Sequence, residues 1–107
     1  MMEEIQVRVT YQGKARRPAL AMRFGDRDQY FSKAHPVVVI ELDGKKAYAR
    51  LQPSFFVRVP QIRTIYEDPD LADRNLLVEW IAKHKVKLGD KVRLQVTERY
   101  KSFRLRI

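Results

Sequence analysis

Several features that would narrow the function are missing from this chain. It contains no cysteine, which excludes a disulfide framework and a thiolate metal site. The longest apolar run, VVVI at residues 37–40, is far too short for a membrane-spanning helix. The N-terminal stretch MMEEIQVRV is acidic and then alternating, so we expect no signal peptide. These absences favour a cytoplasmic protein, associated with the nucleoid, or with the nucleus in a eukaryote.

Acidic residues are also scarce. The chain has 22 Lys and Arg against 13 Asp and Glu, a net charge of +9, and such an excess favours a polyanionic partner. Two windows, residues 5–25 and 44–66, each contain five basic residues and no acid, whereas five acids lie between Glu67 and Glu79. If the two windows meet in space they form one basic face, as binding to phosphates requires.

The 107 residues are expected to form a single domain, residues 1–107. The stretch IQVRVTY (5–11) alternates apolar and polar residues as a half-buried strand does, and ALAMRF (19–24) is a second candidate. Residues 25–35 are expected to form a loop with at most a helical turn. The dipeptide Asp43-Gly44 between two β-prone runs predicts a hairpin.

The second half of the chain adds strands and the main helix. SFFVRVP (54–60) and IRTIY (62–66) are interpreted as strand pieces. A helix is predicted near residues 70–84, capped by Asp70 or Asp73, and two antiparallel strands end the chain. The predicted fold is mostly β (α+β): a small open pseudobarrel of six to seven strands, since closing a sheet removes its edges.

Little in the sequence supports catalysis. His35 and His84 have no second ligand at zinc-like spacing, so we expect no metal site. The triplet Asp43-Gly44-Lys45 has the acid-x-lysine form that some nucleases use to hold magnesium, but it falls on the predicted turn. No serine lies in a nucleophile motif, and the four glycines are isolated, so no phosphate-cradling loop is expected. We therefore predict that the protein is not an enzyme and needs no cofactor.

The last third of the chain, LLVEWIAKHKVKLGDKVRLQVTERYKSFRLRI (76–107), resembles the end of the plant B-three DNA-binding domain. The shared features are a helix carrying Trp80, a Gly89-Asp90 turn, the alternating strand KVRLQV and the last strand FRLRI. Upstream, VVVIELDGKKAYARL is similar to the central hairpin of that family, with Tyr48 where an aromatic residue is usual. The family often has glycine before the helix tryptophan, where Glu79 stands here.

This resemblance implies the DNA-binding pseudobarrel fold, which the family shares with effector domains of some restriction endonucleases. It also implies that two arms grip the major groove of double-stranded DNA. By position the first arm is YQGKARRP (11–18), and the second is LQPSFFVRVPQIRT (51–64). The implied DNA-binding residues, with Arg23 added from the first acid-free window, are Gln12, Lys14, Arg16, Arg17, Arg23, Gln52, Ser54, Arg58 and Arg63.

Three other functions stay open. RNA or single-stranded DNA would bind an OB-like barrel through exposed aromatics such as Tyr11, Tyr30, Phe31 and Tyr48. The basic face would instead bind an acidic protein surface in an interaction or inhibitor module. A small nuclease or toxin would need Asp43 and Lys45 beside another carboxylate.

Overall fold

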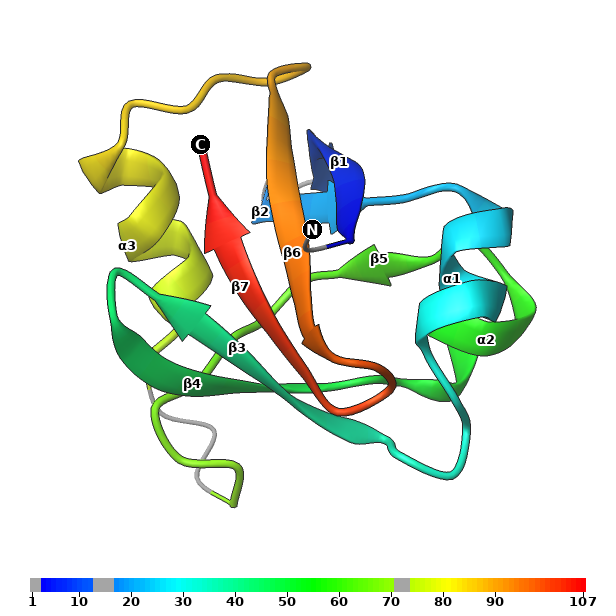
Figure 1. Ribbon diagram of the computed structural model, residues 1–107. Helices are drawn as coiled ribbons and strands as arrows, with labels where there is room; N and C mark the ends of the chain where they lie inside the picture. Colours follow the sequence, from blue (N-terminus) through cyan, green and yellow to red (C-terminus); the bar gives the residue numbers. More distant parts are fainter. Residues whose placement is uncertain (1–2, 13–16, 71–73) are drawn as a thin grey trace.

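The computed structural model describes residues 3–12, 17–70 and 74–107. Within these residues, seven strands and three short helices follow one another along the chain (Figure 1). In order they are β1 (Glu4–Gln12), β2 (Arg17–Ala21), α1 (Phe24–Tyr30), β3 (Val37–Leu42), β4 (Lys45–Arg50), α2 (Pro53–Val57), β5 (Gln61–Ile62), α3 (Leu76–Lys83), β6 (Lys91–Glu98) and β7 (Ser102–Arg106). None of the helices in the described residues is long and apolar enough to span a membrane.

All seven strands belong to one curled, open sheet with the order β4-β3-β7-β6-β1-β2-β5. Strands β3 and β7 run parallel, and the other pairs are antiparallel. The open edges approach each other where Tyr48 of β4 and Tyr66 exchange backbone hydrogen bonds of 2.7 and 2.8 Å. The predicted mostly-β, open half-barrel is thus confirmed.

The β3–β4 turn follows directly from its sequence. Asp43 has φ = 50° and Gly44 has φ = 85°. A two-residue hairpin turn of this kind needs positive φ at both central residues, and its twist matches that of the flanking strands. Asp and Gly are among the residues that accept this conformation most readily, so the predicted hairpin is confirmed.

The helices differ from the prediction in two places. Residues 53–57, predicted to be mostly strand, form α2, with Pro53 in its first turn, where the missing proline N–H costs nothing. The buried ring of Phe55 packs edge-on against Phe31 at 5.1 Å, so core packing favours the helix over the β propensity of the stretch. Strand β5 is only Gln61–Ile62, so of the predicted strand at 62–66 just Ile62 lies in β5, and Tyr66 forms an isolated bridge.

Helices α1 and α3 also differ from the prediction. Residues 24–30, predicted as loop, form helix α1, whose last residue Tyr30 enters the core. Helix α3 confirms the existence of the main helix but begins at Leu76 instead of near residue 70, and Asn75 caps it instead of Asp70 or Asp73, the latter outside the described residues. The Asn75 Oδ1 accepts the N–H groups of Leu77 and Ile65, both at 3.1 Å, so one side chain starts the helix and fixes it to the segment after β5.

The core lies inside the curl of the sheet. Alternate residues of the strands point inward and are buried, among them Ile5, Val7 and Val9 of β1. Helix α3 covers one end of the curl and α1 with α2 covers the opposite end (Figure 1). The inward face of α3 buries Trp80, which is 3 % exposed. This arrangement leaves the polar faces of the strands on the outside of the sheet, available for a site.

Candidate nucleic-acid interface

Strand register brings basic and amide side chains from three strands into one row, with an alanine of a fourth strand between them. Arg8 of β1 lies opposite Lys91 of β6 and opposite Ala21 of β2, and Ala21 lies opposite Gln61 of β5. Residues directly opposite each other in neighbouring strands project from the same face of a sheet. The inward neighbours of Arg8, Val7 and Val9, are buried, so this row lies on the outer face, our name for the outward surface of β6, β1, β2 and β5.

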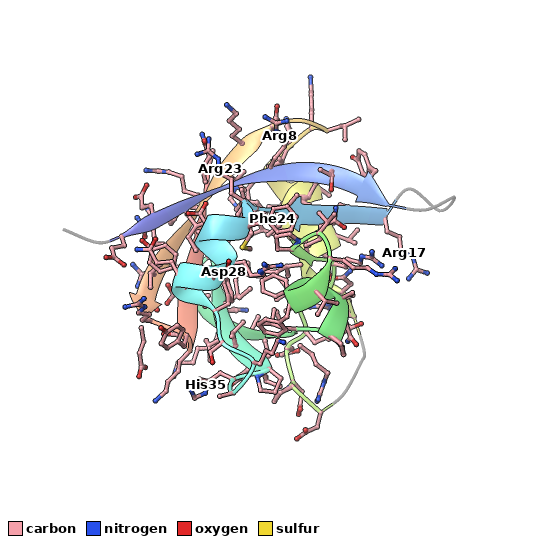
Figure 2. All side chains as sticks on the ribbon, turned by 90° about the vertical axis from the view of Figure 1, so that its right-hand side faces the viewer. Arg8, Arg17, Arg23, Phe24, Asp28 and His35 are labelled. Carbon is pink, nitrogen blue, oxygen red and sulfur yellow. The ribbon has the colours of Figure 1, made fainter. Side chains whose placement is uncertain are left out.

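A shallow groove of about 460 Å³ runs along this outer face. We call it the basic groove; its lining residues are Gln6, Val7, Arg8, Thr10, Ala21, Met22, Arg23, Val59, Gln61 and Lys91. The lining includes three cations, two amides and no carboxylate. Figure 2 shows Arg8 and Arg23 on the β1 side of the molecule and Arg17 at the far end of β2. The groove therefore combines positive charge with groups that donate and accept hydrogen bonds.

The three cations of the basic groove are unpaired. Within the part of the chain that the structure describes, Arg8, Arg23 and Lys91 make no side-chain hydrogen bond and no ion pair. Other cations do have partners, such as Arg104 with Glu41 and Arg93 with Glu4 at 3.6 Å. Unneutralised cations without acids between them add to one positive potential, which attracts a polyanion.

Strand alternation places one further predicted residue on the outer face. Arg17 is two and four positions from Ala19 and Ala21 on β2, and alternate residues of a strand share a face, so Arg17 extends the outer face beyond the groove. Arg63 directly follows the last residue of β5, and both arginines are exposed. The two acid-free windows therefore meet through the pairing of β2 with β5.

The other predicted residues fall into two groups. Lys14 and Arg16 lie outside the described residues, and of Gln12 only the backbone is described, as the last residue of β1. Gln52, Ser54 and Arg58 surround α2 instead of the outer face. All three are exposed, and the structure does not bring them into the basic groove.

Arg27, which no sequence pattern indicated as functional, links α2 to α1. Its Nη1 donates to the carbonyl oxygens of Phe55 (3.4 Å) and Arg58 (3.2 Å), and its Nε donates to Asp28 at 2.9 Å. The guanidinium carbon also lies 5.1 Å from the centre of the Phe24 ring. Arg27 thus holds the α2 part of the second arm through the backbone carbonyls of that arm, and its guanidinium already has partners within the protein.

Sequence reasoning missed four residues of the basic groove as site residues: Gln6, Arg8, Gln61 and Lys91. A signal for three of them was present, because Gln6 and Arg8 occupy the polar positions of the alternating stretch IQVRVTY, and Lys91 occupies a polar position of KVRLQV. Nothing local indicates Gln61, since its place opposite Ala21 depends on the pairing of β2 with β5.

The aromatic residues proposed for single-strand binding are mostly inside the protein. Tyr30 and Phe31 are buried, and the Phe31 ring stacks on Phe103 at 4.6 Å. Tyr11 and Tyr48 are half-buried. Phe31 and Tyr30 therefore serve as core, and they offer no open ring to a nucleic-acid base.

Asp43, the acid of the acid-x-lysine triplet, contacts Lys83 and His84 at the end of α3. Its Oδ2 accepts a hydrogen bond from Lys83 Nζ at 3.0 Å, and its Oδ1 lies 3.0 Å from His84 Nε2. The hydrogen bonds from Lys83 and then His84 lower the pKa of the Asp43 carboxyl below its ordinary value. Among the described residues no three His, Asp or Glu side chains form a group able to hold a metal ion.

Comparison with known proteins gives a family. Residues 1–107 match the model of DUF7112, a family of unknown function, and the chain belongs to this family. No curated protein matches the sequence, and no solved structure matches it. The resemblance to the B-three domain therefore stays a prediction.

Proposed function

We propose that this protein is a non-enzymatic domain that binds double-stranded DNA through the outer face of its half-barrel. The observation that carries the proposal is the set of unpaired cations in the basic groove, with Arg17 and Arg63 beyond it. Among the described residues these side chains have no acidic partner to satisfy them. A phosphate backbone supplies such partners in a row, and each contact releases counterions and adds affinity.

The amides of the groove add a means of reading bases. Gln61 lies in the same row as Arg8, and Gln6 lies two positions from Arg8 on β1. Lys and Arg fix the register of a protein on the duplex through phosphates, whereas Gln can bind adenine and Arg can bind guanine at base edges. Phosphate contacts from Arg8 and Lys91 with base contacts from a neighbouring amide would make such an interface sequence-selective.

The position of the two arms is compatible with the same partner. The first arm connects β1 with β2, and the second arm contains β5, which pairs with β2. Arg27 fixes the α2 part of the second arm by binding the carbonyl of Arg58. The first arm thus joins two strands of the outer face, and the second arm contains a third.

The test is fluorescence anisotropy of the protein with labelled duplex DNA, single-stranded DNA and RNA at several salt concentrations. We expect tight duplex binding, with log K falling against log salt at a slope near −4.5 if Arg8, Arg17, Arg23, Arg63 and Lys91 all contact phosphate, at about 0.9 per contact. Preference for RNA or single strands would instead support the OB-like alternative. No binding to any nucleic acid at low salt would favour an acidic protein partner.

A further inference from the structure

A second groove, next to α2, is built differently from the basic groove. We call it the α2 groove; it measures about 440 Å³ and is lined by Lys33, Pro36, Arg50, Leu51, Gln52, Pro53, Phe56 and Val57. Five of these eight side chains are apolar, two are cations, one is an amide and none is an acid. Volumes of this size are typical of sites for small ligands, which combine apolar walls with a few placed polar groups.

The apolar wall includes an aromatic ring that the core holds in place. Phe56 is partly buried and meets the Phe55 ring edge-on at 5.1 Å. Phe55 in turn contacts Phe31, which stacks on Phe103. A ring fixed in this way loses little conformational entropy when a flat ligand packs against it. The groove therefore presents a preformed apolar surface.

The polar groups of the α2 groove suit an anionic, heteroaromatic ligand. Lys33 has no partner within the described residues, and Arg50 uses one guanidinium nitrogen to donate to the Pro69 carbonyl at 2.9 Å, which leaves other N–H groups to donate. The side chain of Gln52 is exposed and can both donate and accept hydrogen bonds. An aromatic wall, an amide and two cations match the base, the base edge and the phosphate of a nucleotide.

The two grooves are neighbours. Val57 lines the α2 groove and Val59 lines the basic groove, and two residues of chain span at most about 7 Å. A strand that leaves a duplex bound on the outer face would therefore have only a short distance to cross.

From these observations we infer that the α2 groove binds one unpaired nucleotide of DNA, at the point where a single strand leaves a duplex held on the outer face. This inference rests on the proposed function, because the basic groove supplies the duplex contact. The ligand is thus a junction between double- and single-stranded DNA instead of a blunt duplex.

The experiment compares a blunt labelled duplex with the same duplex carrying a short unpaired extension, in which 2-aminopurine occupies the first unpaired position. Anisotropy measures affinity, and 2-aminopurine fluorescence reports stacking. We expect the junction to bind about tenfold more tightly than the blunt duplex, since stacking one base on an aromatic ring contributes an affinity gain of this order. Fluorescence of the probe should fall on binding.

Two variants test the contribution of the α2 groove to junction affinity and keep the fold intact. Phe56→Leu keeps an apolar residue in place and should bring junction affinity down to the blunt-duplex value, with no change for the blunt duplex. Gln52→Ala changes an exposed side chain and should reduce the junction preference in part. The control is Val78→Ala, which shortens an exposed apolar residue of α3 outside both grooves and should leave the preference intact.

The outcomes distinguish this inference from the proposed function. Salt-dependent duplex binding with no preference for the junction, or an unchanged preference in Phe56→Leu, would overturn the nucleotide site and leave the duplex proposal standing. Binding of the extension alone without the duplex would support the groove and overturn the duplex proposal. Absence of binding to either DNA would overturn both.

Discussion

Cations have different acidic surroundings on two sides of this half-barrel. On the outer face of β6, β1, β2 and β5, the basic groove is lined by Arg8, Arg23 and Lys91 and by no carboxylate, although the same face also carries the ion pair of Arg93 with Glu4. Around the β3–β4 hairpin and α3, by contrast, Lys83 binds Asp43 at 3.0 Å, and Lys45 and Lys46 share a pocket with Asp43, Glu67 and Glu79. Since both sides are basic in sequence, net charge alone does not locate an interface. Cations grouped without carboxylates among them do, because only unneutralised cations gain partners from a polyanion.

The largest expected effect is on stability, on the side of the molecule with paired cations. Trp80→Ala empties a site that is 3 % exposed and should lower the free energy of unfolding by about 3–5 kcal/mol, measured by urea denaturation. Arg8→Gln, an exposed residue of the outer face, serves as the control and should stay within about 0.5 kcal/mol of wild type. Equal unfolding midpoints for Trp80→Ala and wild type would contradict the position of α3.

The second prediction concerns DNA affinity and compares equal losses of charge. Arg8→Gln with Lys91→Gln removes two unpaired cations of the basic groove, and should reduce the magnitude of the salt slope by about 1.8. At a salt concentration of 0.1 M this corresponds to a loss of affinity on the order of 60-fold. The measurement is duplex anisotropy against salt.

A matched double variant tests whether position or charge is responsible. Lys45→Gln with Lys46→Gln also removes two charges, from exposed positions on β4 near Glu67 and Glu79. Its slope should stay close to that of wild type. If both double variants change the salt slope by the same amount, DNA binding depends on the net charge of the protein. The outer face is then not the specific interface.

An intermediate effect is expected for Arg27, which fastens the α2 part of the second arm to α1. Arg27→Ala leaves the carbonyls of Phe55 and Arg58 without their donor, in a site where the Arg27 side chain is 13 % exposed. We expect a loss of about 1–3 kcal/mol in the free energy of unfolding. Arg58→Ala, which removes an exposed arginine and retains the carbonyl, should cost little. Comparable losses in the two variants would show that Arg27 does not hold α2.

The smallest expected effect is the pH-dependent contribution of Asp43 to the free energy of unfolding. The pKa of Asp43 is lowered in the folded protein by hydrogen bonds from Lys83 and then His84. A lowered folded-state pKa means that the ionised carboxylate stabilises the fold above the unfolded-state pKa of about 3.9, and that this stability is lost as pH falls through the folded-state value. Because the side chain is 38 % exposed, the contribution should be below about 1 kcal/mol.

Asp43→Asn measures this contribution with little disturbance of the turn, since asparagine also accepts the positive φ of residue 43. The variant should be less stable than wild type near neutral pH, and the difference should shrink as the pH is lowered below about 4. Urea midpoints at a series of pH values give the comparison. A difference that stays constant down to the acid limit would mean that the carboxylate charge has no part in it.

The interface could be predicted from sequence only where one local pattern was sufficient. The acid-free windows pointed to Arg17, Arg23 and Arg63, and these residues lie on or beside the outer face. The second-arm assignment of Gln52, Ser54 and Arg58 came from the resemblance to the B-three family, and the structure places these residues in and beside α2, where a strand was predicted. Phe55 decided this, because its burial against Phe31 outweighs the local preference of the stretch.

What the sequence determined by itself is local. Asp43-Gly44 specifies a hairpin turn through positive φ, and the alternation in IQVRVTY separates Ile5 and Val7, which enter the core, from Gln6 and Arg8, which stay outside. Only the tertiary structure decided which of these polar faces meet. The pairing of β2 with β5 and of β1 with β6 joins segments far apart in the chain, and such contacts form because they bury a shared core, which no short window of sequence encodes.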